Sequence, residues 1–144
     1  MNYAIAENKE EIHFFIDKKN FGGHRNYRNS PDEKSITVSA SPLREFIADQ
    51  KISAIKIDVE GAELNVLQGM EDIIESHKPL LIVECANEEL ANKGPLYQYF
   101  LNFTNVNVFH LHLNKFVSLE AISDFAKEEH RKNVQLHNYF FKFD

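Results

Sequence analysis

The sequence predicts an α/β protein, and three patterns along the chain support that fold class. Segments rich in β-branched and aromatic residues alternate with segments whose apolar residues recur every three or four positions. Two strand-like segments, 52–59 and 80–85, are separated by a helical pattern long enough for the crossover that joins parallel strands. The segment LLIVEC at 80–85 is an uninterrupted apolar run, which is typical of a strand buried on both faces. Together these patterns predict a parallel β-α-β unit at the centre of the chain.

The N-terminal third predicts two short strands and a short helix. Segment 11–17 is rich in aromatic residues and segment 35–39 in β-branched residues, so both are expected to be strands. The residues between them carry glycine, proline and asparagine, which are typical of a loop. Ser41 is a plausible N-cap and Pro42 occupies the favoured first helical position, so a short helix is expected to begin there.

The central crossover is expected to be one helix over 62–77. Its last turn carries His77 and the following Lys78, which suit the negative end of the helix dipole, and Pro79 ends it. Apolar residues at helical spacing form one stripe along this segment: Val66, Leu67, Met70, Ile73 and Ile74. Beyond the second central strand, the patterns predict in order a helix, a strand, a helix and a strand: 95–103, 105–113, 118–132 and 138–143.

Length and composition restrict the classes of function. A chain of 144 residues is expected to form one domain. Its net charge of -6 disfavours nucleic-acid binding, which depends mainly on phosphate neutralisation. A single cysteine, Cys85, excludes an intrachain disulfide and suits a reducing compartment. The N-terminus lacks the layout of a secretory signal and no apolar run approaches the length of a membrane span, so a cytoplasmic protein with no membrane partner is expected.

Acidic side chains occur where the two central strands are expected to end. Asp58 and Glu60 follow the apolar part of the first strand, and Glu84 lies near the end of the second. Open parallel sheets bind ligands beyond the carboxyl ends of their strands, and neighbouring strands lie about 4.8 Å apart. We therefore expect Asp58 and Glu84 to converge on one site, with Glu60 and Glu63 near its rim.

A cluster of carboxylates is costly unless a cation lies beside it or one acid stays protonated, so it indicates a ligand. The candidates are a divalent metal, a cationic cofactor, or a substrate hydroxyl or amine whose proton a carboxylate accepts. A purely structural alternative remains for two members of the cluster. Glu60 and Glu63 could simply solvate a loop and favour a helix N-terminus.

At these residues the chain resembles the FkbM-type methyltransferases, which use S-adenosylmethionine and have a Rossmann-like sheet. The resemblance rests on IKIDVEGAELNVLQG followed by KPLLIVE, and it extends upstream to NYAIAENKEEIHFF, a Gly-Gly pair and ITVSASPLREFI. It implies O-methylation of a small-molecule or saccharide hydroxyl. It also implies roles for residues of this chain: catalysis by Asp58 and Glu60, cofactor binding by Asp58 and Gly61, and substrate binding by Glu84 and Glu63, with no metal ligands.

The resemblance covers only the later half of the family's fold. The five glycines do not form the spacing of a cofactor loop, and the first strands have no counterpart. Residues 1–144 are therefore expected to be a single, N-terminally truncated methyltransferase domain. The strand at 55–59 would then lie at an exposed sheet edge. That edge could pair with a second copy, with a complementing chain, or with segment 12–17 folding back over it.

Weaker readings remain open. His110 and His112 could share a strand face and bind a metal with His130 or His137. Cys85 is more simply a buried apolar residue than a nucleophile. A TIM barrel, which takes about 250 residues, is disfavoured by length. The main rival to an enzyme is a non-catalytic remnant that acts as an oligomerising or binding module. One loop combines cations with aromatic rings, as phosphate or single-stranded nucleic-acid sites do: Lys18, Lys19, Phe21, Arg25, Tyr27 and Arg28.

Overall fold

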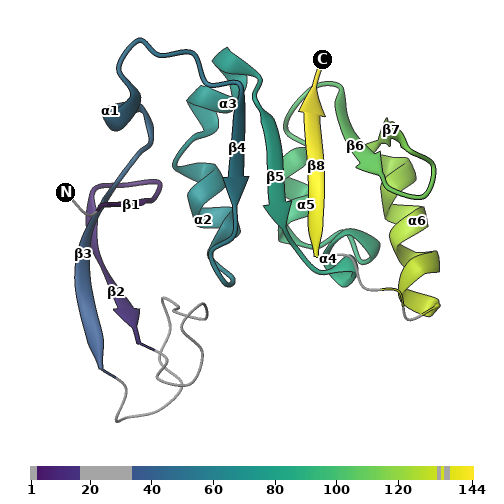
Figure 1. Cartoon of the computed structure of the whole chain (residues 1–144), viewed down its shortest axis with the longest axis horizontal. Helices are drawn as coiled ribbons and strands as arrows, with labels where there is room; N and C mark the ends of the chain where they lie inside the picture. Colours follow the sequence, from purple (N-terminus) through teal and green to yellow (C-terminus); the bar gives the residue numbers. More distant parts are fainter. Residues whose placement is uncertain (1–2, 17–33, 133, 135–136) are drawn as a thin grey trace. The chain divides into compact units, whose positions relative to one another are not determined.

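The computed structural model describes residues 3–16, 34–132, 134 and 137–144 (Figure 1). Over these residues the protein is a mixed α/β structure with a three-stranded and a five-stranded sheet, which confirms the predicted class. The chain divides into two compact units. The first unit comprises Met1–Gln50 and Val59–Ile73, and the second comprises Lys51–Asp58 and Ile74–Asp144.

The first unit contains the three-stranded sheet. Its strands are β1 (Tyr3–Ile5), β2 (Glu10–Phe15) and β3 (Ser35–Ser41), in the order β1-β3-β2. β3 pairs parallel to β1 and antiparallel to β2. Both predicted strands are thus present. β1 is an additional strand that was not predicted, because three residues are too few to show a periodic pattern.

The helix expected from Ser41 begins later and is shorter. Ser41 belongs to β3, where it pairs with Ile5 and its carbonyl accepts a hydrogen bond from the Ala6 amide at 3.3 Å. Sheet pairing therefore extends the strand through Ser41, and α1 runs only from Arg44 to Ile47, with Leu43 as its N-cap. The predicted N-cap role of Ser41 is wrong.

The single helix expected over 62–77 is two helices, α2 (Glu63–Gln68) and α3 (Glu71–His77). The break lies at Gly69, where a β-carbon would sit 2.4 Å from the backbone carbonyl of Ala6. The Gly69 carbonyl is also turned to the Leu43 amide at 2.9 Å. Only a residue without a side chain permits this close approach of two backbone segments. The Gly69 carbonyl accepts a hydrogen bond from Leu43 and not from an amide of the next helical turn.

The second unit contains the five-stranded sheet. Its strands are β4 (Ala54–Ile57), β5 (Leu80–Glu84), β6 (Val106–His110), β7 (Lys115–Ser118) and β8 (Asn138–Phe143), in the order β4-β5-β8-β6-β7. β4 and β5 are parallel neighbours, as predicted, and β8 runs antiparallel between β5 and β6.

β4 is the edge strand of this sheet, as the resemblance implied. The described residues of segment 12–17 do not pair with it, because β2 pairs with β3 in the other, three-stranded sheet, so the expected fold-back is wrong. Pairing of the β4 edge with a second copy or a complementing chain stays a prediction.

One face of the second sheet forms the core of this unit. Leu81 and Val83 pair across the sheet with Phe141 and Tyr139, and all four side chains are buried. In Figure 1, α5 (Pro95–Phe100) lies behind β8, and the Phe100 ring stacks on Phe141 with centroids 4.0 Å apart. These rings tie a helix to the strand that joins both halves of the sheet.

Two further helices complete the second unit. α4 (Asn87–Ala91) packs against α6 (Leu119–Arg131), whose N-cap Ser118 accepts a hydrogen bond from the Ala121 amide at 3.2 Å. Asn87 accepts a buried hydrogen bond of 2.8 Å from the Tyr139 hydroxyl. Burial raises the pKa of Tyr139, so this hydroxyl stays protonated and donates.

Candidate functional site

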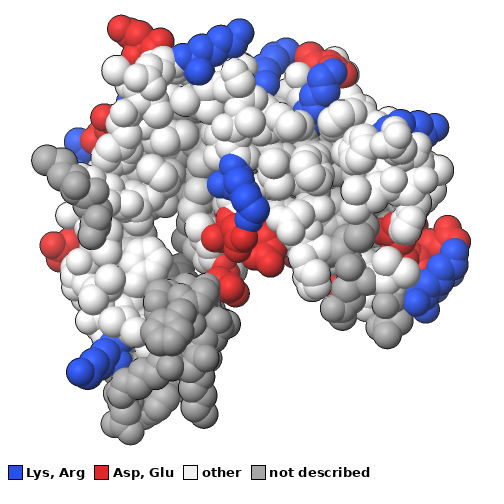
Figure 2. Space-filling model, in the orientation of Figure 1, with Lys and Arg blue, Asp and Glu red and all other residues white. Residues whose placement is uncertain are grey.

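Asp58 and Glu84 lie side by side at the carboxyl ends of β4 and β5. The strands pair in parallel up to Ile57 and Val83. Asp58 and Glu84 are the residues that follow this last pair, so they are neighbours at the same end of the two strands. The Glu84 side chain lies close enough to Asp58 to lower the pKa of the Asp58 carboxyl by hydrogen bonding. Figure 2 shows acidic side chains over this end of the two strands, with a basic side chain beside them. The convergence expected from the sequence is therefore present in the structure.

Lys56 completes this cluster. Side chains two residues apart in a strand point to the same face, and the Lys56 ammonium donates a hydrogen bond to Oδ2 of Asp58. Lys56 interrupts the apolar run of the strand, and its spacing from Asp58 is the signal that could have identified it. The sequence patterns alone predict no role for Lys56.

The pKa of Asp58 is lowered from its ordinary 3.8, first by the hydrogen bond from Lys56 and then by the one with Glu84. Because this pKa lies below its ordinary value, the Asp58 carboxyl is ionised at neutral pH. With its side chain 45% exposed, this ionised carboxylate is accessible to a ligand. The site therefore presents a carboxylate that stays charged throughout the neutral pH range.

Replacing Lys56 with Met should raise the pKa of Asp58 toward its ordinary value, because the largest cause of the lowering is removed. The measurement is an NMR titration that follows the side-chain carboxyl carbon of Asp58. As a matched control, Lys142→Met should raise the pKa of Asp144, which Lys142 lowers in the same way, and leave Asp58 unchanged. An unchanged Asp58 midpoint in Lys56→Met would contradict the assignment.

The other predicted site residues form the turn that leads into α2, in the first unit. Gly61 has φ +95, a conformation that other residues rarely adopt, and Glu60 before it has φ 52. Glu63 is buried, and its Oε1 accepts hydrogen bonds from the amides of Gly61 at 3.0 Å and Val59 at 3.4 Å.

Glu63 therefore has a structural role, because its carboxylate satisfies backbone amides of the turn that precedes its helix. Glu60 is exposed on the same turn. Gly61 permits the tight turn, as expected from the sequence. The catalytic, cofactor and substrate roles predicted for these three residues stay predictions.

The weaker histidine hypothesis changes in the structure. β6 ends at His110, so His112 lies in the following turn and not on the same strand. Nε2 of each ring lies near Oε1 of the buried Glu129, at 3.6 Å for His110 and 3.7 Å for His112. Within the described part of the chain, no group of three or more His, Cys, Asp or Glu side chains is arranged to hold a metal ion.

The remaining sequence candidates have simple placements. His130 pairs with Glu88 at 3.2 Å, and the buried Cys85 donates its amide to the His137 carbonyl at 2.9 Å. The loop that combines cations with aromatic rings, within residues 17–33, lies outside the described residues. Among the described residues, no helix has both the length and the apolar character needed to cross a membrane.

The fold and the carboxyl pair define a class: an α/β protein with acidic groups at the carboxyl ends of neighbouring parallel strands, where open α/β sheets bind small ligands. The family model described as the methyltransferase FkbM domain matches residues 1–121, and the chain belongs to this family of methyltransferases. No curated protein and no solved structure matches the chain. The resemblance seen in the sequence is confirmed.

Proposed function

We propose that this protein transfers a methyl group from S-adenosylmethionine to a hydroxyl oxygen of a small molecule or saccharide. The observation that carries the proposal is the ionised Asp58 beside Glu84 at the carboxyl ends of two parallel strands. Family membership supplies the reaction class, and the carboxyl pair supplies a group able to bind a hydroxyl.

The charge of the site suits this cofactor. S-adenosylmethionine carries a sulfonium cation, and Asp58 stays ionised because Lys56 and Glu84 both favour its charged form. Asp58 is exposed enough for a ligand to reach it. We therefore assign Asp58 as the residue that would lie next to the cationic part of the cofactor.

When bound, S-adenosylmethionine supplies an electrophilic methyl group on a good leaving group, so the protein needs mainly to align the acceptor. The Asp58 carboxylate can accept a hydrogen bond from the acceptor hydroxyl and hold its oxygen in one orientation. Its low pKa makes it a weak base, so the proton passes to Asp58 only as the acceptor oxygen forms its new bond. The neighbouring Glu84 also favours the ionised form of Asp58.

Calorimetric titration of the whole chain with S-adenosylmethionine tests the proposal. We expect a dissociation constant between roughly 1 μM and 1 mM, the range of ordinary enzyme substrates. Binding should weaken in Asp58→Asn and persist in Asp124→Asn, which removes a carboxylate that is 76% exposed on α6. Absence of heat at millimolar cofactor would contradict the proposal and favour a non-catalytic binding module.

A further inference from the structure

A pocket in the first unit has the dimensions and lining of a small-molecule site. Its volume is about 720 Å³, within the usual range for ligand pockets. We propose that it binds a neutral, polyhydroxylated ring such as a monosaccharide. The pocket is lined by residues of β1, β3, α1 and the β1–β2 connection: Tyr3, Ile5, Lys9, Ser41, Glu45 and Phe46.

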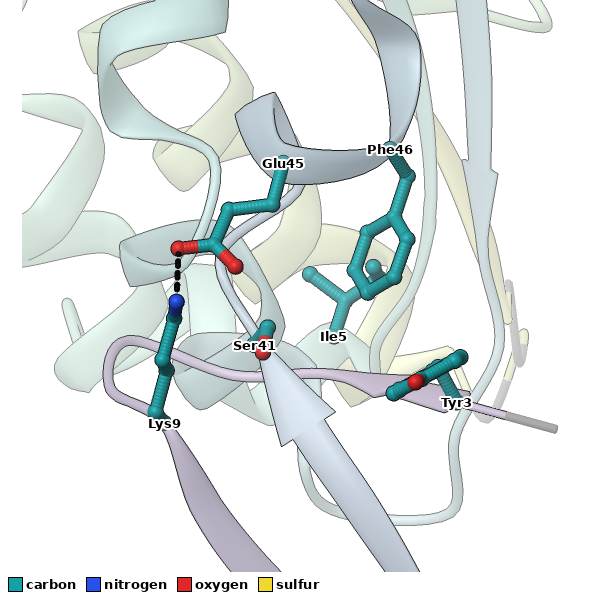
Figure 3. A pocket seen from close by; sticks show the side chains of 6 residues that line it. All are labelled: Tyr3, Ile5, Lys9, Ser41, Glu45 and Phe46. Carbon is teal, nitrogen blue, oxygen red and sulfur yellow. Dashed lines mark ion pairs between the residues drawn. The ribbon is translucent and has the colours of Figure 1, made fainter. Parts of the chain in front are cut away.

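Two aromatic rings form the apolar side of the pocket. Tyr3 on β1 and Phe46 on α1 have ring centroids 5.1 Å apart and planes tilted by 49°, and Ile5 lies beside them (Figure 3). Both rings are nearly half exposed, at 48% and 43%, although large aromatic side chains are normally covered. The face of an aromatic ring is electron-rich and attracts the weakly positive C–H bonds of a saturated ring. These rings therefore offer a stacking surface to such a ligand.

The polar side of the pocket consists of an ion pair. Lys9 Nζ lies 2.9 Å from Glu45 Oε1, and the two side chains are 70% and 36% exposed. Figure 3 shows this pair opposite the aromatic rings, with Ser41 between the two sides. The ammonium offers only donors and the carboxylate only acceptors, whereas a hydroxyl both donates and accepts. Adjacent hydroxyls of one ligand can therefore bind both members of the pair.

The ion pair also selects against charged ligands. An anion would be repelled by Glu45 and would compete with it for Lys9. A cation would be repelled by Lys9 and would compete with it for Glu45. A neutral ligand leaves the pair intact and adds hydrogen bonds to it. A sugar ring combines an apolar C–H face with hydroxyl groups around its edge. The C–H face matches the aromatic side of the pocket, and the hydroxyl groups match the side with the ion pair.

This proposal does not rest on methyl transfer, because the pocket lies wholly within the first unit and binding needs no cofactor. Ligand-observed saturation-transfer NMR on the whole chain, without S-adenosylmethionine, tests it. The probes are methyl β-glucopyranoside, its anionic counterpart glucuronate and its cationic counterpart glucosamine. We expect the neutral glycoside to bind with a millimolar dissociation constant, and the two charged sugars to bind at least about fivefold more weakly.

Two variants locate the binding. Phe46→Ala should weaken binding of the glycoside by about tenfold, because half of the stacking surface is lost. Glu45→Gln should reduce the discrimination against glucuronate, and it leaves the aromatic rings in place if Phe46→Ala does not fold. The control Phe116→Ala removes a ring that is 41% exposed in the second unit and should leave binding unchanged. No binding at about 50 mM glycoside, equal binding of all three sugars, or equal binding by Phe46→Ala and Phe116→Ala would overturn the proposal.

Discussion

Asp58→Asn is expected to lower the rate of methyl transfer by roughly 10²- to 10⁴-fold, the usual contribution of a positioned acid–base group. Asparagine has the same shape, but its amide cannot take up the acceptor's proton or carry the negative charge. The side chain of Asp58 is 45% exposed and lies at the end of a strand, so the fold should tolerate the change. The measurement is transfer of a labelled methyl group from S-adenosylmethionine to a defined panel of monosaccharides and small alcohols.

Two further variants make this test specific. Asp124→Asn removes an exposed carboxylate on α6 and should leave the rate unchanged. Glu84→Gln places an amide donor beside Asp58 and leaves the Asp58 carboxylate in place, so its rate should fall less than that of Asp58→Asn. If Asp58→Asn transfers methyl groups as fast as Asp124→Asn, then Asp58 takes no part in the reaction.

Phe141→Ala is expected to lower the free energy of unfolding by about 3–5 kcal/mol, the cost of emptying an aromatic core position. Phe141 is fully buried on β8, between β5 and β6, and its ring stacks on Phe100 at 4.0 Å. The cavity would lie between α5 and the strand that connects both halves of the second sheet. Since domains have only about 5–15 kcal/mol of stability, this one change removes a large part of it. Denaturant unfolding followed by circular dichroism measures the loss.

Phe116→Ala is the matched control for this prediction. Phe116 is the same residue type on the same sheet, but it lies on β7 and is 41% exposed. Its loss should cost well under half of the change in Phe141→Ala, because less apolar surface returns to water. Equal losses in the two variants would show that the stack on Phe100 does not anchor the core.

Much of the site could be predicted from the sequence, because the strands that position it are indicated by short runs of neighbouring residues. The apolar run before Asp58 and the one before Glu84 each indicate a strand, and the length between them indicates a parallel crossover. Parallel pairing in register then brings the two strand ends together, as the structure has them. A helix over 118–132 is predicted for the same reason, and the structure has α6 at Leu119–Arg131.

Other features depend on partners that are distant in the sequence. The apolar stripe over 62–77 runs through Gly69 without interruption, yet the helix breaks there because the backbone of Ala6 approaches it. Ser41 has the chemistry of an N-cap, but pairing with β1 makes it part of a strand. In both cases a long-range backbone contact outweighs a local preference worth about 1 kcal/mol.

The local order of residues was thus sufficient for the α/β class, the central β-α-β unit, the family and the acidic strand ends. The tertiary structure decided which charged groups interact. Lys56 and Glu84 favour the ionised form of Asp58, and the Glu63 carboxylate accepts a hydrogen bond from the backbone of the turn before its helix. The tertiary structure also assembled the pocket between Tyr3 and Phe46 from two strands, the β1–β2 connection and a helix. Periodicity reports which face of an element is buried, whereas hydrogen bonds and ion pairs act over a few ångströms and depend on which elements pack together.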